Sequence, residues 1–182
     1  EYVKEIVEAT QEQGFIIVYH NCGNYALQLI DSILDTGCRV FHFGDAVQMK
    51  DMLEKMPADC VAMGNISPSQ QFRNGTPQSV RIETVRLLEE CKDFRNFVIS
   101  SGCDIPPLTE FENIDAFFDT VESFYYRQRL LDIIMKLFLG FVTPFLLDSR
   151  FITGCPFSIW LPLLKIFIKP LLFFLSYDMF IL

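Results

Sequence analysis

Three side chains of the metal-binding kind lie where the sequence predicts strands to end. His20 ends the apolar run 15–20, and Cys22 follows two residues later. Residues two apart in an extended chain point the same way, so both side chains can reach one ion. Cys103 follows a second apolar run at 96–100. One imidazole and two thiolates form a common zinc set, and three protein ligands leave a fourth position for a reactant. The residue types suit a catalytic zinc site, but the spacing alone is a weak signal for it and favours a helix-capping histidine with two buried thiols.

Three further polar residues near predicted strand ends are candidates for catalysis. Asp45 follows the second strand, where its carboxylate would orient the His20 ring or bind substrate; a plain helix cap is the equal alternative. Asn65 ends the third strand and, with Ser67, would line the mouth of the site. Asp104 comes directly after the second candidate thiolate, where it would cap a turn or meet substrate.

Other residues with reactive or bulky side chains are predicted to be structural. His42 is out of phase with Asp45 in a regular strand, so we expect it to face the helices. The remaining thiols and two aromatic residues at helical spacing are expected in the core: Cys38, Cys60, Cys91, Phe117 and Phe118.

Apolar runs alternate with helical spacing along the first two thirds of the chain. The runs predict strands at 15–20, 39–43, 60–63 and 96–100. Helical spacing predicts helices at 2–13, 24–36, 46–56, from Pro77 to about Cys91, and 114–121. Strict alternation indicates a parallel α/β sheet with right-handed crossovers, and active sites of such folds lie at the carboxyl ends of the strands. Four such units are half of an eight-stranded barrel, and no G-x-G-x-x-G follows a strand as a dinucleotide-binding sheet would require.

The composition changes sharply along the 182 residues. Residues 1–124 hold most of the acidic side chains behind the net charge of -8, whereas 125–182 are net basic and rich in Leu, Phe, Ile and Pro. Excess acid argues against a nucleic-acid partner. The six cysteines are scattered rather than spaced like a disulfide framework, and no signal-peptide pattern follows Glu1. We therefore expect a cytoplasmic protein.

Five short motifs occur in order within residues 1–125. They are His20-Asn21-Cys22-Gly23-Asn24, Met63-Gly64-Asn65-Ile66-Ser67-Pro68, Gly75-Thr76-Pro77, Ser101-Gly102-Cys103-Asp104-Ile105-Pro106-Pro107 and Glu112-Asn113-Ile114. Together they resemble the C-terminal half of the uroporphyrinogen decarboxylase superfamily. More narrowly, they resemble its corrinoid-dependent methyltransferase branch, which includes the methylcobalamin:coenzyme M methyltransferases and the O-demethylase methyltransferases.

The resemblance implies a (β/α)8 barrel with its site in the C-terminal mouth. In that branch a His-x-Cys pair and a later Cys hold zinc, and these map onto His20, Cys22 and Cys103. The implied reaction moves a methyl group between a corrinoid carried by a partner protein and a thiol or methoxylated substrate, with zinc as the Lewis acid. The decarboxylases proper resemble the chain in fold but use no metal and lack this ligand set; a decarboxylase of porphyrin biosynthesis is therefore the alternative.

The resemblance covers residues 1–125 and implies that a first half of the barrel would precede Glu1. Without it, an incomplete enzyme or an inactive truncated remnant is expected. Residues 126–182 match nothing in the family, and their longest uncharged run, 151–164, is shorter than the roughly 20 residues of a membrane-spanning helix. We expect a hydrophobic extension of non-family origin, with membrane contact as the less favoured alternative.

Overall fold

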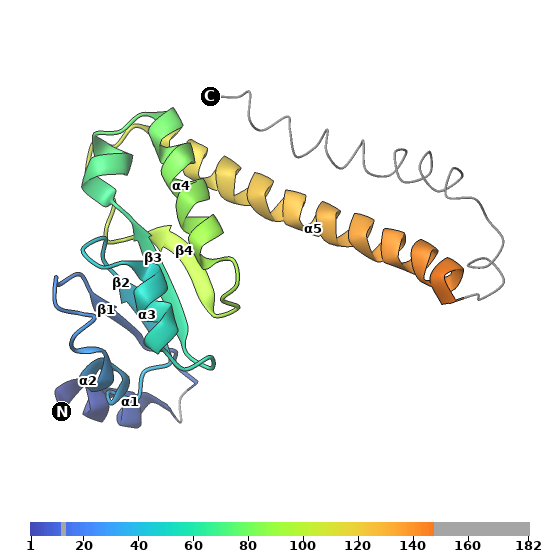
Figure 1. Ribbon diagram of the computed structural model, residues 1–182. Helices are drawn as coiled ribbons and strands as arrows, with labels where there is room; N and C mark the ends of the chain where they lie inside the picture. The colour runs from blue at the N-terminus through green and yellow to red at the C-terminus, as the bar shows by residue number, and fades with distance from the viewer. Residues whose placement is uncertain (12–13, 148–182) are drawn as a thin grey trace. The chain divides into compact units, whose positions relative to one another are not determined.

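The computed structural model describes residues 1–11 and 14–147 (Figure 1). The strands are β1 (Val18–Asn21), β2 (Val40–Phe43), β3 (Val61–Ile66) and β4 (Phe97–Ser101). The helices are α1 (Tyr2–Gln11), α2 (Ile30–Leu34), α3 (Met49–Lys55), the π-helical turn η1 (Pro68–Arg73), α4 (Pro77–Cys91) and α5 (Phe111–Leu147). The strands form one sheet in the order β1-β2-β3-β4 with every pairing parallel. This arrangement is half of a (β/α)8 barrel and confirms the predicted fold class.

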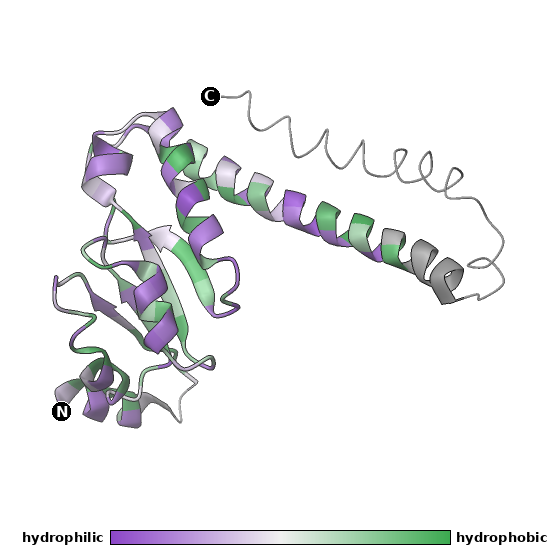
Figure 2. Ribbon diagram, in the orientation of Figure 1, coloured by the Kyte–Doolittle hydropathy of each residue, from purple (hydrophilic) through white to green (hydrophobic). Residues whose placement is uncertain are grey.

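The sheet has one face covered by helices and one open face. Phe41 and Phe43 of β2 are fully buried on the covered face, with their rings stacked 6.3 Å apart. Ala62 of β3 is buried on the same face, where α3 and α4 contact the sheet. Val18 and Val98 point to the open face and are about half exposed. Figure 2 shows the corresponding hydrophobic residues along β3 and β4 and hydrophilic residues over much of α4.

Helix α4 begins at the residues that the sequence indicates. The Thr76 hydroxyl accepts a hydrogen bond from the Ser79 backbone N–H, and the Ser79 hydroxyl accepts one from the Thr76 backbone N–H. Pro77 occupies the first helical position, where its missing N–H is no loss. This reciprocal cap fixes the start of the helix that covers β3 and β4.

The start of α5 is anchored to the connection between η1 and α4. The Asn113 amide nitrogen donates to the carbonyl oxygens of Phe72 and Gly75 at 3.0 and 3.1 Å. Phe117 is buried with its ring 5.5 Å from that of Phe72, as predicted. Phe118 is 63% exposed, so its predicted place in the core is wrong. Consecutive helical residues point about 100° apart, and of this pair only Phe117 faces the core.

Strand β1 and helix α2 are shorter than the sequence predicts. Pairing begins at Val18 because its partner across the register, Val40, is the first residue of β2. Phe15 and Ile16 precede the strand and are exposed. The apolar run at 15–20 therefore predicts a strand correctly but overestimates its length. Turns replace the first half of the helix expected over 24–36, leaving α2.

The chain divides into two compact units, residues 1–128 and 129–182. The boundary expected between residues 125 and 126 falls inside α5 and stays a prediction. No helix among the described residues is both long enough and apolar enough to cross a bilayer. The predicted character of the extension beyond residue 147 lies outside the described residues. Cys38, Cys60 and Cys91 are buried, as expected.

Candidate metal centre

His20, Cys22 and Cys103 come together at the carboxyl edge of the sheet. His20 lies in β1, Cys22 directly after it, and Cys103 two residues after β4. Their ligand atoms all lie within 4.8 Å of one another, and His20 Nε2 is 3.5 Å from Cys103 Sγ. Residues from the first strand and from just after the last strand of the described sheet thus come together in one cluster, as the curvature of a barrel wall would allow.

One ligand separation in the cluster matches that expected around a tetrahedral zinc ion. With Zn–N near 2.0–2.1 Å and Zn–S near 2.3 Å, a tetrahedral angle separates a nitrogen and a sulfur ligand by about 3.6 Å. The 3.5 Å between His20 Nε2 and Cys103 Sγ matches this separation. An imidazole with two thiolates also suits zinc chemically, because soft sulfur ligands select it over magnesium or calcium. The side chains of His20 and Cys22 are exposed, which leaves the cluster open to reactants.

A backbone carbonyl holds the His20 ring in the orientation that a metal ligand needs. His20 Nδ1 lies 3.2 Å from the carbonyl oxygen of His42 on the neighbouring strand. A proton on Nδ1 would be donated to this oxygen, and Nε2, which faces Cys103, would keep its lone pair for a metal.

Two glycines let the loops around the cluster pack against one another. A Cβ atom on Gly44, in the loop after β2, would lie 2.6 Å from the Cβ and 2.7 Å from the Cα of Cys22. A Cβ atom on Gly102 would lie 2.8 Å from the backbone nitrogen of Asp45. Real Cβ atoms do not approach so closely, so the backbone itself would have to move. The spacing of the ligands therefore depends on residues that touch no metal.

We predict that Gly44→Ala weakens zinc binding by at least about tenfold without removing a ligand, because it displaces the backbone of Cys22. Competition with a chromogenic chelator measures the affinity of the full chain. Gly23→Ala is the matched control, since its new Cβ would meet only the movable Asn21 side-chain oxygen at 3.1 Å. A folded Gly44→Ala protein with the affinity of the unchanged chain would contradict the prediction.

Asp45 and Asn65 lie together at a second feature, a polar pocket of about 270 Å³ whose lining includes none of the three cluster residues. The Asn65 amide nitrogen donates to the carbonyl oxygens of Gly44 and Val47 at 3.0 and 2.7 Å. Asn65 therefore holds the loop that carries Asp45 rather than pointing freely into the mouth. The pocket is lined by Asp45, Val47, Gln48, Met49, Asn65, Ser67, Gln70, Gln71, Glu83, Arg86 and Leu87.

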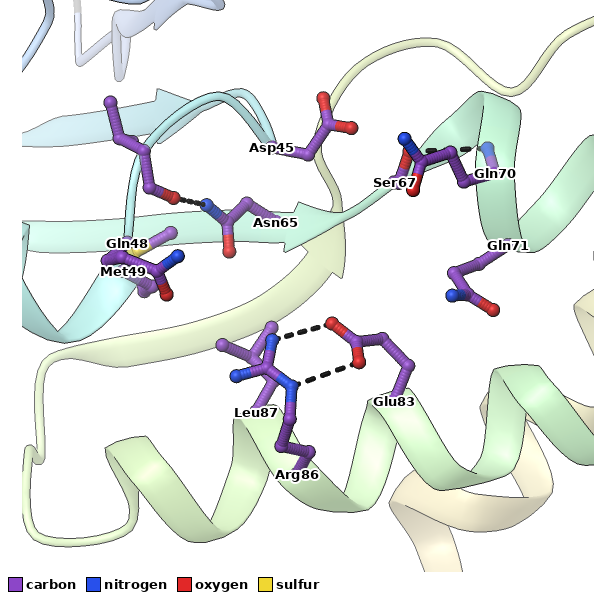
Figure 3. A pocket seen from close by; sticks show the side chains of 11 residues that line it. Asp45, Gln48, Met49, Asn65, Ser67, Gln70, Gln71, Glu83, Arg86 and Leu87 are labelled. Atoms are coloured by element: carbon purple, nitrogen blue, oxygen red, sulfur yellow. Dashed lines mark hydrogen bonds and ion pairs between the residues drawn. The ribbon is translucent and has the colours of Figure 1, made fainter.

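An ion pair on α4 forms the opposite wall of this pocket, as Figure 3 shows. Arg86 Nε and one terminal nitrogen donate to the two carboxylate oxygens of Glu83 at 2.9 and 2.6 Å. The hydrogen bond from Arg86 lowers the pKa of Glu83, and the same contact raises the pKa of Arg86. The wall thus keeps both charges near neutral pH. Sequence reasoning missed it, although a Glu and an Arg three apart on a helix are a signal for such a pair.

His42 lies on the open face of the sheet, so its predicted direction toward the helices is wrong. Its ring centroid is 4.7 Å from that of His20, and its Nε2 is 2.7 Å from the carbonyl oxygen of Ser101. Phe41 and Phe43 take the covered face, which sends His42 the other way. The prediction counted parity from Asp45, but β2 ends at Phe43 and the alternation does not continue into the loop.

Asp104 follows the cluster in sequence, and its side chain is exposed. Asp45 is exposed as well and lines the pocket. The structure therefore joins the three predicted metal ligands in one place and sets Asp45 and Asn65 at a separate polar pocket. The catalytic roles of Asp45, Asn65 and Asp104 stay predictions.

Comparison with known proteins relates the chain to one family. The profile of the family described as uroporphyrinogen decarboxylase matches residues 1–124. The methylcobamide:CoM methyltransferase MtbA of Methanosarcina acetivorans is 29% identical over 126 residues, which are 69% of this chain and 35% of that protein. A uroporphyrinogen decarboxylase of Pseudoalteromonas translucida is 28% identical over 97 residues, 53% of this chain and 27% of that protein.

A solved structure supports the fold. A methyltransferase from Methanosarcina mazei superposes with a TM-score of 0.58 at 22% identity, over 68% of this chain and 34% of that one. The chain thus spans about a third of the length of the methyltransferases that it matches.

Proposed function

The chain belongs to the uroporphyrinogen decarboxylase family, and on this premise we propose that it acts in zinc-dependent transfer of a methyl group between a corrinoid protein and a thiol or methoxylated substrate. The observation that carries the proposal is the convergence of His20, Cys22 and Cys103 within 4.8 Å. The similarity to methylcobamide:CoM methyltransferases supports the same reaction class.

His20, Cys22 and Cys103 would hold the zinc as a neutral imidazole and two thiolates. The metal, when bound, supplies a Lewis acid that keeps a substrate thiol deprotonated or polarises a methoxy oxygen. The two thiolates leave the site electron-rich, which preserves the nucleophilicity of a bound sulfur. The exposed side of His20 and Cys22 gives the methyl donor access.

Asp45, Asn65 and Asp104 are the proposed substrate-binding and catalytic residues. Asn65 fixes the loop of Asp45 through its two hydrogen bonds to backbone carbonyls. Asp45 and Asp104, whose side chains are exposed, would offer their carboxylates to the polar part of the substrate. A polar pocket of about 270 Å³ next to Asp45 has room for several waters or a small polar group.

A corrinoid protein is the proposed partner, docking over the carboxyl edge of the sheet where the cluster is exposed. We also propose a reducing compartment such as the cytoplasm. Metal binding needs Cys22 and Cys103 as free thiolates, and both are free in the structure.

The experiment begins with the full chain purified without chelators and its zinc content measured by mass spectrometry. We expect about one zinc per chain. Methylcobalamin and a small thiol such as coenzyme M are then added, and loss of the methyl group is followed by the visible spectrum of the corrinoid. Transfer that stops with a chelator and returns with zinc supports the proposal. A chain that binds no zinc from zinc-replete medium would refute it, and zinc binding without transfer would favour the inactive remnant.

A decarboxylase acting on a porphyrinogen is the second candidate, favoured by the similarity to uroporphyrinogen decarboxylases. It predicts turnover of a porphyrinogen that is unaffected by metal removal. The same preparation tested with uroporphyrinogen, with and without chelator, separates the two candidates.

A further inference from the structure

His42 lies between the two parts of the sheet that carry the candidate metal ligands. Strand β2 pairs with β1, and the register sets His42 directly beside His20. The two rings are 4.7 Å apart between centroids and tilted by 36°, so the His42 ring lies against the ring of the candidate ligand.

The other end of the same ring reaches the segment that carries Cys103. His42 Nε2 is 2.7 Å from the carbonyl oxygen of Ser101, to which it donates in its neutral Nε2–H form and also when charged. The Ser101 hydroxyl donates to the carbonyl oxygen of Cys103 at 2.7 Å. A connected path therefore runs from His20 through His42 and Ser101 to Cys103.

We propose that His42 is a positioning residue that sets the distance between His20 and Cys103 without binding the metal itself. This inference rests on the proposed zinc site and adds a residue that the ligand motif does not contain. His42 spans from β2 to the end of β4, past β3, so it fixes the curvature that brings the outer strands together. A second contact acts on the same candidate ligand from the backbone, where the carbonyl oxygen of His42 accepts a hydrogen bond from His20 Nδ1.

The test compares His42→Asn with His42→Gln in the full chain. The Gln amide N–H extends about as far as the imidazole Nε2–H, whereas the chemically equal Asn amide is one methylene shorter. We expect His42→Asn to weaken zinc binding by about 10–100-fold, the usual cost of losing a group that orients a ligand. His42→Gln is expected to stay within about threefold of the unchanged chain. Affinities come from chelator competition with zinc.

A second readout separates positioning from general stability. Cobalt(II) in place of zinc gives visible bands whose energy and intensity follow the ligand geometry, and we expect them to change in His42→Asn but not in His42→Gln. Val98→Ala, also on the open face of the sheet, is the control and should change neither affinity nor spectrum.

Unchanged zinc affinity and cobalt bands in His42→Asn would overturn the inference. Equal losses in both His42 variants would overturn it too, because the bond to Ser101 would not be the cause. If the unchanged chain binds no zinc, the proposed function fails instead.

Discussion

Replacing Cys103 by Ser is expected to leave the chain essentially without zinc. A hydroxyl does not supply the thiolate charge, and only His20 and Cys22 would remain of the three converging ligands. Zinc sites in small domains contribute about 10–16 kcal/mol at neutral pH. Losing about 4 kcal/mol of this raises the dissociation constant about a thousandfold. The zinc content of protein dialysed against buffer, set beside the unchanged chain, measures the effect. Cys22→Ser should behave in the same way.

Cys91→Ala is the matched control for loss of a thiol. Burial raises the pKa of the Cys91 thiol to about 11, so this group is protonated near neutral pH and is no metal ligand. The variant should keep its zinc even if the core is less stable. The zinc site would be disproved if Cys103→Ser retained about one zinc per chain after dialysis.

Replacing Gly64 by Ala is expected to have the largest effect on stability. Gly64 lies within β3 with φ at +134°, a conformation that residues with a side chain rarely adopt. Its new Cβ would lie 2.5 Å from the carbonyl oxygen of Phe43 and 2.9 Å from Cε of Met49. Backbone strain of about 1–3 kcal/mol adds to overpacking of about 1–3 kcal/mol. We expect the free energy of unfolding to fall by about 2–6 kcal/mol, measured by urea titration of the full chain.

Gly14→Ala separates the two causes of that loss. Gly14 also has a positive φ, +73°, but its new Cβ would meet no atom within 4 Å. Only the backbone cost of about 1 kcal/mol remains there. A Gly64→Ala protein no less stable than Gly14→Ala would show that the close approach to Phe43 does not constrain the strand.

The order of the elements was predictable because each carries its own local signal. The strands are short apolar runs, and the start of α4 is indicated by Thr76 at the N-cap and Pro77 at the first helical position. What failed depends on partners far along the chain. Phe15 and Ile16 have the composition of a strand, but β2 begins too late in the register to pair with them. Phe118 is the same residue type as Phe117, and it is exposed only because it points to another side of α5.

The convergence of His20, Cys22 and Cys103 was predictable, since strand ends of a parallel sheet meet at one edge. Its surroundings were not. The direction of His42 cannot be counted back from Asp45, because β2 ends at Phe43 and the alternation of side chains stops there. The spacing of Glu83 and Arg86 indicates the ion pair itself. Its place in the pocket wall depends on how α4 packs beside the end of β3, which no local pattern in the sequence determines.

The strand order has a thermodynamic consequence for folding. The proposed ligands His20 and Cys103 are 83 positions apart in sequence, His20 in β1 and Cys103 just after β4, the two outermost strands of the described sheet. An ion shared between them closes a loop that contains nearly the whole sheet, in the manner of a disulfide bond. Closing a loop of that size lowers the entropy of the unfolded chain, which raises its free energy by about 4–5 kcal/mol on the estimate used for covalent cross-links. Metal loading would then raise the melting temperature of all four strands together rather than only that of the loops that touch the ion.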